Sequence, residues 1–270
     1  PSAGSQNVLA RFGDAGKVAA ECDVTVAVLG INKSIEREGQ DRFSLELPVD
    51  QQEFIKELYK VNPNTVVVLV AGSSMAVNWM DENVPAILNA WYPGEQGGNA
   101  VAEVLFGDYN PGGRLPLTYY NSLDEIPAFD NYSVKGRTYQ YFEGQPLYEF
   151  GYGLSYTKFR YKSKGVNVEQ DTVKVSFEVS NTGKYDGDEV AQVYVKYPET
   201  GTYMPLKQLH GFKRVHIKKG KTSKVTIGVP KKDLRYWDEQ ERKFVTPKGE
   251  YTFMVGASSD DIKFRETVGL

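Results

Sequence analysis

The sequence predicts an α/β fold in its first part, with a mostly parallel sheet sandwiched by helices, followed by an all-β sandwich. Short β-branched runs alternate with helical patterns up to residue 106, and period-two alternation of apolar residues replaces them after Gly165. The charge also changes sign, because residues 1–157 carry 10 Lys and Arg against 20 Asp and Glu, whereas residues 158–270 carry 22 against 15. A chain of 270 residues suffices for two domains, and we expect their boundary between residues 157 and 158.

The elements of the first part follow one another as in an open parallel sheet covered on both faces. They are a strand at residues 23–30, a helix at 48–59, a strand at 65–70, a strand at 86–91 and a helix at 97–106. Pro48 suits the start of the first of these helices. Since ligands bind at the carboxyl ends of parallel strands, the functional edge is expected in the loops at residues 30–42, 72–79 and 92–98.

Residues 107–157 are rich in Gly, Pro and Tyr and show no sustained period. Such a turn-rich wrapping segment with many aromatic residues is expected to pack against something. The strands of the second part are then predicted from alternating runs at residues 173–179, 189–195, 224–229 and 251–255, separated by turns. About seven short strands in roughly 105 residues are typical of a β-sandwich.

Composition and motifs exclude several classes of protein. One cysteine, Cys22, and two histidines leave neither a disulfide framework nor a Cys/His metal site, so no metal is expected. The longest apolar run is far shorter than the ~20 residues of a membrane span, and the first residues predict no signal peptide. The lysines of the basic half are scattered, which argues against a nucleic-acid partner.

The glycine-rich loop at residues 94–98 lacks the lysine and the spacing of a phosphate-binding loop, so we expect tight packing there instead of a nucleotide. Ser73 and Ser74 do not lie in a Gly-x-Ser-x-Gly elbow, which argues against a serine hydrolase. No organic cofactor is implied by any of these patterns.

The densest polar cluster lies at residues 32–42, directly after the first predicted strand. Its composition alone is compatible with a solvated loop, but its position at a carboxyl end of the sheet favours a functional one. A carboxylate there suits general acid catalysis. The Asp41-Arg42 step is expected to form a structural ion pair that fixes the loop.

Several motifs together resemble glycoside hydrolase family 3, in order and over nearly the whole chain. They are Ser-Ile-Glu-Arg-Glu-Gly-Gln-Asp-Arg at residues 34–42 with Leu-Glu-Leu-Pro at 45–48, Trp-Tyr-Pro-Gly-Glu-Gln-Gly-Gly at 91–98, the motif at 105–116, and Phe-Gly-Tyr-Gly-Leu-Ser-Tyr at 150–156. Residues 179–183, 187–194 and 206–212 resemble the family's C-terminal fibronectin type III-like (immunoglobulin-like) domain. The first motif looks closest to the β-xylosidase branch, and β-glucosidases share most of it.

The resemblance implies an exo-acting, retaining β-glycosidase that acts on β-linked xylo- or gluco-oligosaccharides with two carboxylates about 5–5.5 Å apart. The family's acid/base glutamate lies on the first motif, where Glu36 is the position we match to it and Glu38 is the rival, and Asp41 and Arg42 would support the loop. Enzymes of this family are often periplasmic or secreted, so the same location is expected here.

One departure from the family is large. Its nucleophile is an aspartate in a Ser/Thr-Asp-Trp type motif on an N-terminal (β/α)8 barrel, and this motif does not occur in the sequence. A barrel needs about 250 residues, and fewer than 25 precede the first predicted strand. We therefore expect the chain to be the C-terminal part of such an enzyme, inactive alone, with the barrel as its partner. Part of the segment at residues 107–157 would then pack against this barrel. The alternative is a non-catalytic carbohydrate-binding or scaffolding module.

Overall fold

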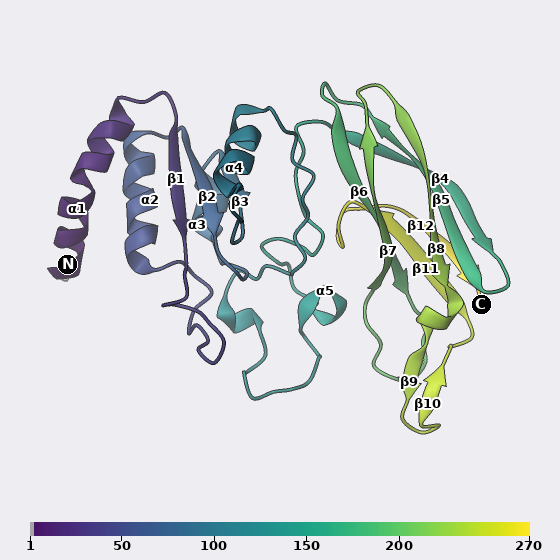
Figure 1. The fold of residues 1–270 in the computed structure, drawn as a ribbon. Helices are drawn as coiled ribbons and strands as arrows, with labels where there is room; N and C mark the ends of the chain where they lie inside the picture. The colour runs from purple at the N-terminus through teal and green to yellow at the C-terminus, as the bar shows by residue number, and fades with distance from the viewer. Residues whose placement is uncertain (1–2) are drawn as a thin grey trace. The chain divides into compact units, whose positions relative to one another are not determined.

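The computed structural model describes residues 3–270, with side chains from residue 12 onward. The chain forms two compact units, one comprising residues up to Glu103 with Tyr119–Ile126 and the other Val104–Thr118 with Pro127–Leu270. The predicted fold class is confirmed, because the first unit holds a parallel sheet with helices and the second an antiparallel β-sandwich (Figure 1). The predicted boundary between residues 157 and 158 separates two family domains, whereas the compact units are defined by contacts within the chain. The units therefore do not test this boundary, which stays a prediction.

The first unit is built on a parallel sheet with the strand order β1-β2-β3. Its strands are β1 (Thr25–Gly30), β2 (Thr65–Val70) and β3 (Ala86–Asn89). The middle strand, β2, buries consecutive residues on both of its faces, including Val67, Val68 and Leu69. This position explains why its sequence is a continuous apolar run rather than an alternating one.

Four α-helices accompany this sheet: α1 (Ala3–Ala20), α2 (Val49–Val61), α3 (Asn78–Asn83) and α4 (Gly97–Phe106). A short 3₁₀ turn lies at Leu123–Glu125. α2 begins at Val49, one residue after the predicted start at Pro48, and it buries Ile55 and Leu58 completely or nearly so. α1 packs against α2, where the rings of Phe12 and Phe54 lie 4.4 Å apart. No prediction covers α1 and α3.

The second unit contains two antiparallel sheets, with orders β4-β5-β8 and β12-β11-β6-β7. Their strands are β4 (Phe159–Val168), β5 (Thr172–Asn181), β6 (Gly187–Lys196), β7 (Gln208–Ile217), β8 (Thr222–Pro230), β11 (Glu250–Gly256) and β12 (Ile262–Gly269). These are the seven strands of the predicted sandwich. The unit also contains the helix α5 (Thr138–Tyr141), the 3₁₀ turn η2 (Lys231–Leu234), and a separate ribbon of β9 (Tyr236–Asp238) and β10 (Lys243–Val245).

The core of the sandwich lies between the inner faces of its two sheets. Alternate residues of β5, namely Val173, Val175, Phe177 and Val179, are fully or almost fully buried. β6, β8 and β11 contribute alternate apolar residues in the same way. The period-two pattern of the sequence therefore reports burial of one face of each strand.

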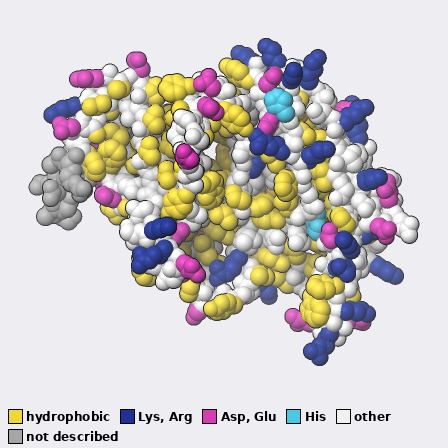
Figure 2. All heavy atoms as spheres, viewed as in Figure 1, with side chains coloured by type: hydrophobic (Ala, Val, Ile, Leu, Met, Phe, Trp, Pro, Cys, Tyr) yellow, Lys and Arg dark blue, Asp and Glu magenta, His cyan; other side chains and the backbone are white. Residues whose placement is uncertain are grey.

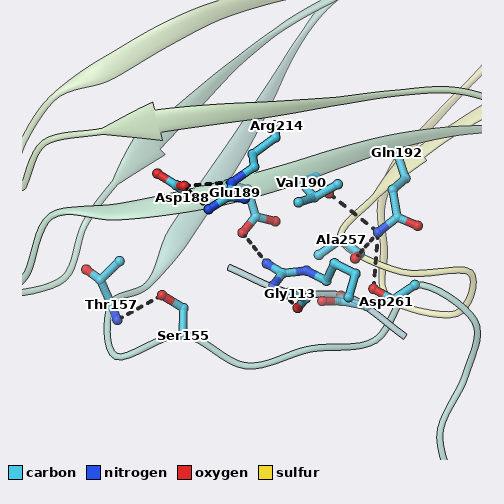
Figure 3. Close-up of polar contacts among 12 residues, drawn as sticks. Gly113, Ser155, Thr157, Asp188, Glu189, Val190, Gln192, Arg214, Ala257 and Asp261 are labelled. Carbon is cyan, nitrogen blue, oxygen red and sulfur yellow. Dashed lines mark hydrogen bonds and ion pairs between the residues drawn. The ribbon is translucent and has the colours of Figure 1, made fainter. Parts of the chain in front are cut away.

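The turn-rich segment at residues 107–157 packs largely on the sandwich. Arg114 Nη2 donates to Glu189 Oε2 on β6 at 2.9 Å, and their side chains are only 8% and 3% exposed. The second oxygen of Glu189 accepts a hydrogen bond from Tyr161 at 2.6 Å. Figure 3 shows Glu189 reaching toward the segment that holds Gly113, whereas Gln192 on the same strand points toward Ala257.

The two glycine-rich motifs of this segment also bind each other. Leu115 donates its backbone N–H to the Tyr152 carbonyl at 2.8 Å, and Gly151 donates to the Leu115 carbonyl at 2.7 Å. Gly151 has a φ of 83°, and a Cβ at this position would lie 2.1 Å from Gln192 Oε1. Only glycine satisfies both conditions. The motifs at residues 105–116 and 150–156 are thus joined into one layer on β6.

We predict that Glu189→Gln destabilises the second unit by about 3–5 kcal/mol, because it leaves the Arg114 guanidinium buried without its counter-charge. Glu169→Gln is the matched control, since Glu169 pairs with Lys174 in the same sandwich but both side chains are more than 40% exposed. Loss of that pair should cost less than about 1 kcal/mol. Urea denaturation of the whole chain measures both changes, and equal destabilisation by the two variants would contradict the anchoring role of Glu189.

Candidate functional site

The loops that follow β1, β2 and β3 lie at one edge of the parallel sheet, as the sequence predicts. In-register parallel pairing places Gly30 of β1 beside Val70 of β2, and Leu69 beside Asn89 of β3. The chain leaves all three strands at this edge. The polar cluster of residues 32–42 belongs to the first of these loops, so the fold brings it to the position where open α/β sheets bind ligands.

The start of the first loop is fixed by two amide side chains. Gln51 of α2 both accepts from the Gly30 N–H and donates to the Gly30 carbonyl, each at 2.8 Å. Asn32 Oδ1 accepts from the backbone and the hydroxyl of Ser34, at 2.9 and 2.6 Å. The exit from β1 is therefore held in one conformation before the carboxylates are reached.

Arg42 is the centre of the site. Its Nε–H donates to Glu36 Oε2, and its Nη2 donates to Ser73 Oγ at 2.9 Å and to the Ser74 carbonyl at 2.8 Å. Ser73 Oγ in turn donates to Glu36 Oε2 at 2.8 Å. The three side chains form a closed triangle that joins the loop after β1 to the loop after β2. We call Glu36, Arg42 and Ser73 the arginine clamp.

The guanidinium of the arginine clamp is also nearly removed from solvent. The Arg42 side chain is 8% exposed, and that of Glu36 is 26% exposed. Nη1 donates to the Leu45 carbonyl at 3.3 Å and approaches Met75 Sδ at 3.1 Å. Hydrogen bonds and an ion pair together compensate the cost of burying this charge.

The sequence predicts that Asp41 and Arg42 form the ion pair that fixes the loop. Among the described residues, Arg42 makes its ion pair with Glu36 and not with the neighbouring Asp41, which is exposed. Sequence reasoning considered Ser73 only as a nucleophile and missed its place in the arginine clamp. The signal that was available is its position at the end of the neighbouring strand.

Glu38 has a different environment from Glu36, although only Arg37 separates them. Arg37 and Gln40 exchange two backbone hydrogen bonds, of 3.1 and 2.9 Å, which close a turn with Glu38 and Gly39 at its tip. Gly39 has a φ of 74°, as the second central residue of such a turn requires. Glu38 is exposed, and it makes no hydrogen bond or ion pair with the other described side chains. The turn therefore leaves one carboxylate available beside the clamp.

The described residues include no group of three or more His, Cys, Asp or Glu side chains arranged to hold a metal ion. Over the same part of the chain, none of the helices combines the length and the apolar character that crossing a membrane requires. The chemistry that this edge of the sheet itself offers is that of carboxylates, a guanidinium and hydroxyl groups.

Comparison with known families identifies both parts of the chain. Residues 4–156 match the glycosyl hydrolase family 3 C-terminal domain, and residues 189–259 match the fibronectin type III-like domain. A xylan 1,4-beta-xylosidase of Xylanibacter ruminicola is 43% identical over 225 residues, which are 83% of this chain and 26% of the relative. A beta-xylosidase of Formosa agariphila is 38% identical over 268 residues, 93% of this chain and 36% of the relative.

A solved structure is similar over almost the whole chain. The crystal structure of beta-glucosidase from Kluyveromyces marxianus in complex with glucose superimposes with a TM-score of 0.89 at 36% identity, covering 96% of this chain and 33% of that one. The chain thus spans about a quarter to a third of the length of these relatives.

We predict that Arg42→Met increases amide hydrogen exchange at Ile35, Glu36 and Gln40 by about tenfold or more, because hydrogen bonds to a charged group are worth about 1.5–3 kcal/mol. Arg37→Met is the matched control. Arg37 lies in the same loop, but its side chain is exposed and, among the described residues, donates only to the Lys33 carbonyl, at 3.1 Å. Exchange that rises equally in both variants would show that the arginine clamp does not hold the loop.

Proposed function

Because the chain belongs to glycosyl hydrolase family 3, we propose that it supplies the general acid/base carboxylate of a retaining, exo-acting β-glycosidase. The nucleophile would be an aspartate on an N-terminal (β/α)8 barrel, as the resemblance of its motifs to this family implies. The observation that carries the proposal is the pair of carboxylates, Glu36 and Glu38, at the carboxyl edge of the parallel sheet. They occupy the loop on which the family carries its acid/base glutamate.

We assign the acid/base role to Glu38, which reverses the order of preference that the sequence suggests. A general acid has to carry a proton, reach the glycosidic oxygen and later accept a proton from water. The Glu36 carboxylate accepts from both the Arg42 guanidinium and the Ser73 hydroxyl on one oxygen, and these two donors hold it against the loop after β2. Glu38, exposed at the tip of its turn, is free of both constraints.

Glu36 acts in this proposal as a positioning residue. Its ion pair with Arg42 joins the loop after β1 to Ser73 and Ser74 after β2. Fixing this loop fixes the base of the turn that carries Glu38, because only one residue lies between the two glutamates. The rate depends on where the acid is held, since small displacements of a reacting group lower the rate by large factors.

The reaction then follows the double displacement of retaining glycosidases. The barrel aspartate attacks the anomeric carbon while the Glu38 carboxyl group gives its proton to the departing glycosidic oxygen. A covalent glycosyl–aspartate intermediate and a free alcohol result. In the second step the Glu38 carboxylate takes a proton from water as the water oxygen attacks the anomeric carbon, which releases the sugar and restores both carboxyl groups.

For the substrate we propose β-linked xylosides first and β-linked glucosides second. The motif at residues 34–42 looks closest to that of β-xylosidases, and two of the relatives described above bear xylosidase names. The relative of known structure described above is a beta-glucosidase bound to glucose, so we retain glucosides as the second candidate substrate. The ratio of hydrolysis rates on aryl β-xyloside and aryl β-glucoside decides between them.

In the complete enzyme we predict that Glu38→Gln lowers turnover by about 10²–10⁴-fold on xylobiose, whose leaving group needs a proton. The glycosylation step on a dinitrophenyl xyloside should be spared, because this leaving group departs as a stable anion. Glu36→Gln is the matched control two residues away. It should lower both reactions by a similar, smaller factor, because it loosens the loop without removing the acid.

The measurement is steady-state and single-turnover kinetics on the two substrates. If Glu36→Gln shows the selective loss and Glu38→Gln the uniform one, Glu36 is the acid and our assignment is wrong by two residues.

We also predict that the 270-residue chain alone releases no nitrophenol from aryl β-xyloside or β-glucoside, and that addition of a matching barrel domain restores release. The reason is that the covalent step needs a nucleophile from the barrel. The control is the same mixture with the barrel aspartate replaced by asparagine. Activity of the chain without a barrel would place a nucleophile within these residues and overturn the proposed division of the site.

A further inference from the structure

The second unit contains an aromatic cavity of about 200 Å³ that the proposed catalysis does not use. Its walls come from α5, from the connection between β6 and β7 with the first residue of β7, and from β9 with the residue before it. We call it the ribbon pocket. Its volume lies below the roughly 300–1,000 Å³ typical of sites for drug-sized ligands, so it suits a single small ring.

Aromatic faces dominate the ribbon pocket. Trp237 of β9 and Tyr203 line it while remaining 49% and 47% exposed. The rings of Tyr203 and Tyr141 are stacked, with centroids 5.4 Å apart and 17° between their planes. Trp237 faces Phe244 across the ribbon at 5.3 Å, and Figure 2 shows a cluster of hydrophobic side chains over β9 and β10. Exposed aromatic side chains gathered in this way make the pocket a candidate binding surface.

Hydrogen-bonding groups stand between these rings and are held by the fold. Gln208 Oε1 accepts from the Tyr197 hydroxyl at 3.0 Å, which orients the amide. The Arg235 guanidinium donates through Nε to the Lys232 carbonyl and lies 5.7 Å from the Phe244 ring. Gln140 adds a second amide to the lining. The pocket therefore combines flat apolar faces with fixed donors and acceptors at its walls.

We propose that the ribbon pocket binds one sugar ring of a β-linked glycan. A pyranose presents C–H groups on its faces, which pack on aromatic rings, and hydroxyl groups around its edge, which pair with amides and guanidinium groups. A protein partner fits less well, because a stable interface takes about 20–30 residues from each side, whereas the exposed aromatic surface here is confined to a few side chains. The choice of xylan and glucan oligomers as probes rests on the proposed function.

Trp237 and Phe244 also stabilise the ribbon itself, so a test has to distinguish loss of binding from unfolding of the ribbon. A two-stranded ribbon is marginally stable by itself, and a cross-strand pair of aromatic residues stabilises it. A variant that simply unfolds the ribbon would also lose binding. Trp237→Tyr addresses this, because tyrosine retains an aromatic face in the pocket and a cross-strand aromatic pair with Phe244.

The experiment is calorimetric titration of the whole chain with xylohexaose and cellohexaose, accompanied by thermal unfolding of each variant. We expect the unmodified chain to bind at least one probe, Trp237→Ala to weaken binding on the order of tenfold, and Trp237→Tyr to retain most of it. Phe212→Ala is the matched control, since Phe212 is a 67% exposed aromatic residue on β7 that does not line the pocket. Its affinity should equal that of the unmodified chain.

Three results would overturn the proposal: no heat of binding with either probe at millimolar concentration, equal affinity in Trp237→Ala, or equal weakening by Phe212→Ala. Loss of self-association in Trp237→Ala, without sugar binding by any variant, would instead assign the patch to a protein interface. Hydrolysis of aryl glycosides by the complete enzyme is the separate readout for catalysis. An active enzyme without titratable binding refutes only the ribbon pocket, and binding with an inactive enzyme refutes only the proposed function.

Discussion

Parallel pairing of β1 with β2 is the constraint on which the candidate site depends. It brings the chain out of both strands at one edge, so that Arg42 on the first loop reaches Ser73 and Ser74 on the second. Neither loop contains a helix or strand, and besides the arginine clamp they share one isolated bridge between Glu46 and Ala76, where the Ala76 N–H donates to the Leu45 carbonyl at 2.9 Å. The arginine clamp binds the two loops to each other, and the turn with Glu38 at its tip follows directly from the loop that is held in this way.

The second unit uses a buried arginine in a similar way. Arg114 lies in the turn-rich segment and meets Glu189 on β6, as Arg42 meets Glu36. In both cases a segment without repetitive structure is attached through a guanidinium that offers several donors in a fixed plane. Burying such a pair costs desolvation that its attraction only partly repays. Its contribution is therefore to specify one attachment geometry for an irregular segment, which apolar packing alone would leave less well defined.

The sequence predicts the elements whose burial follows a simple period. The strand at residues 65–70 and the alternating strands of the sandwich are recognisable because one or both of their faces are buried along their whole length. α3 has six residues, too few to show a helical period, and no prediction covers it. The partner of Arg42 is not predictable from the sequence either, since it depends on a turn at residues 37–40 and on Ser73, which lies more than thirty residues further along the chain.

The same turn separates the two glutamates that sequence spacing alone leaves as alternatives. Glu36 precedes the turn and lies against the loop after β2, where the guanidinium and the Ser73 hydroxyl bind one of its oxygens. Glu38 occupies the tip, where the positive φ of Gly39 reverses the chain and no other described side chain holds the carboxylate. A loop that needs one anion to pair with its arginine and another to exchange protons with a substrate has to place them in different environments. The tight turn places the two carboxylates in different environments although they are only two residues apart in the sequence.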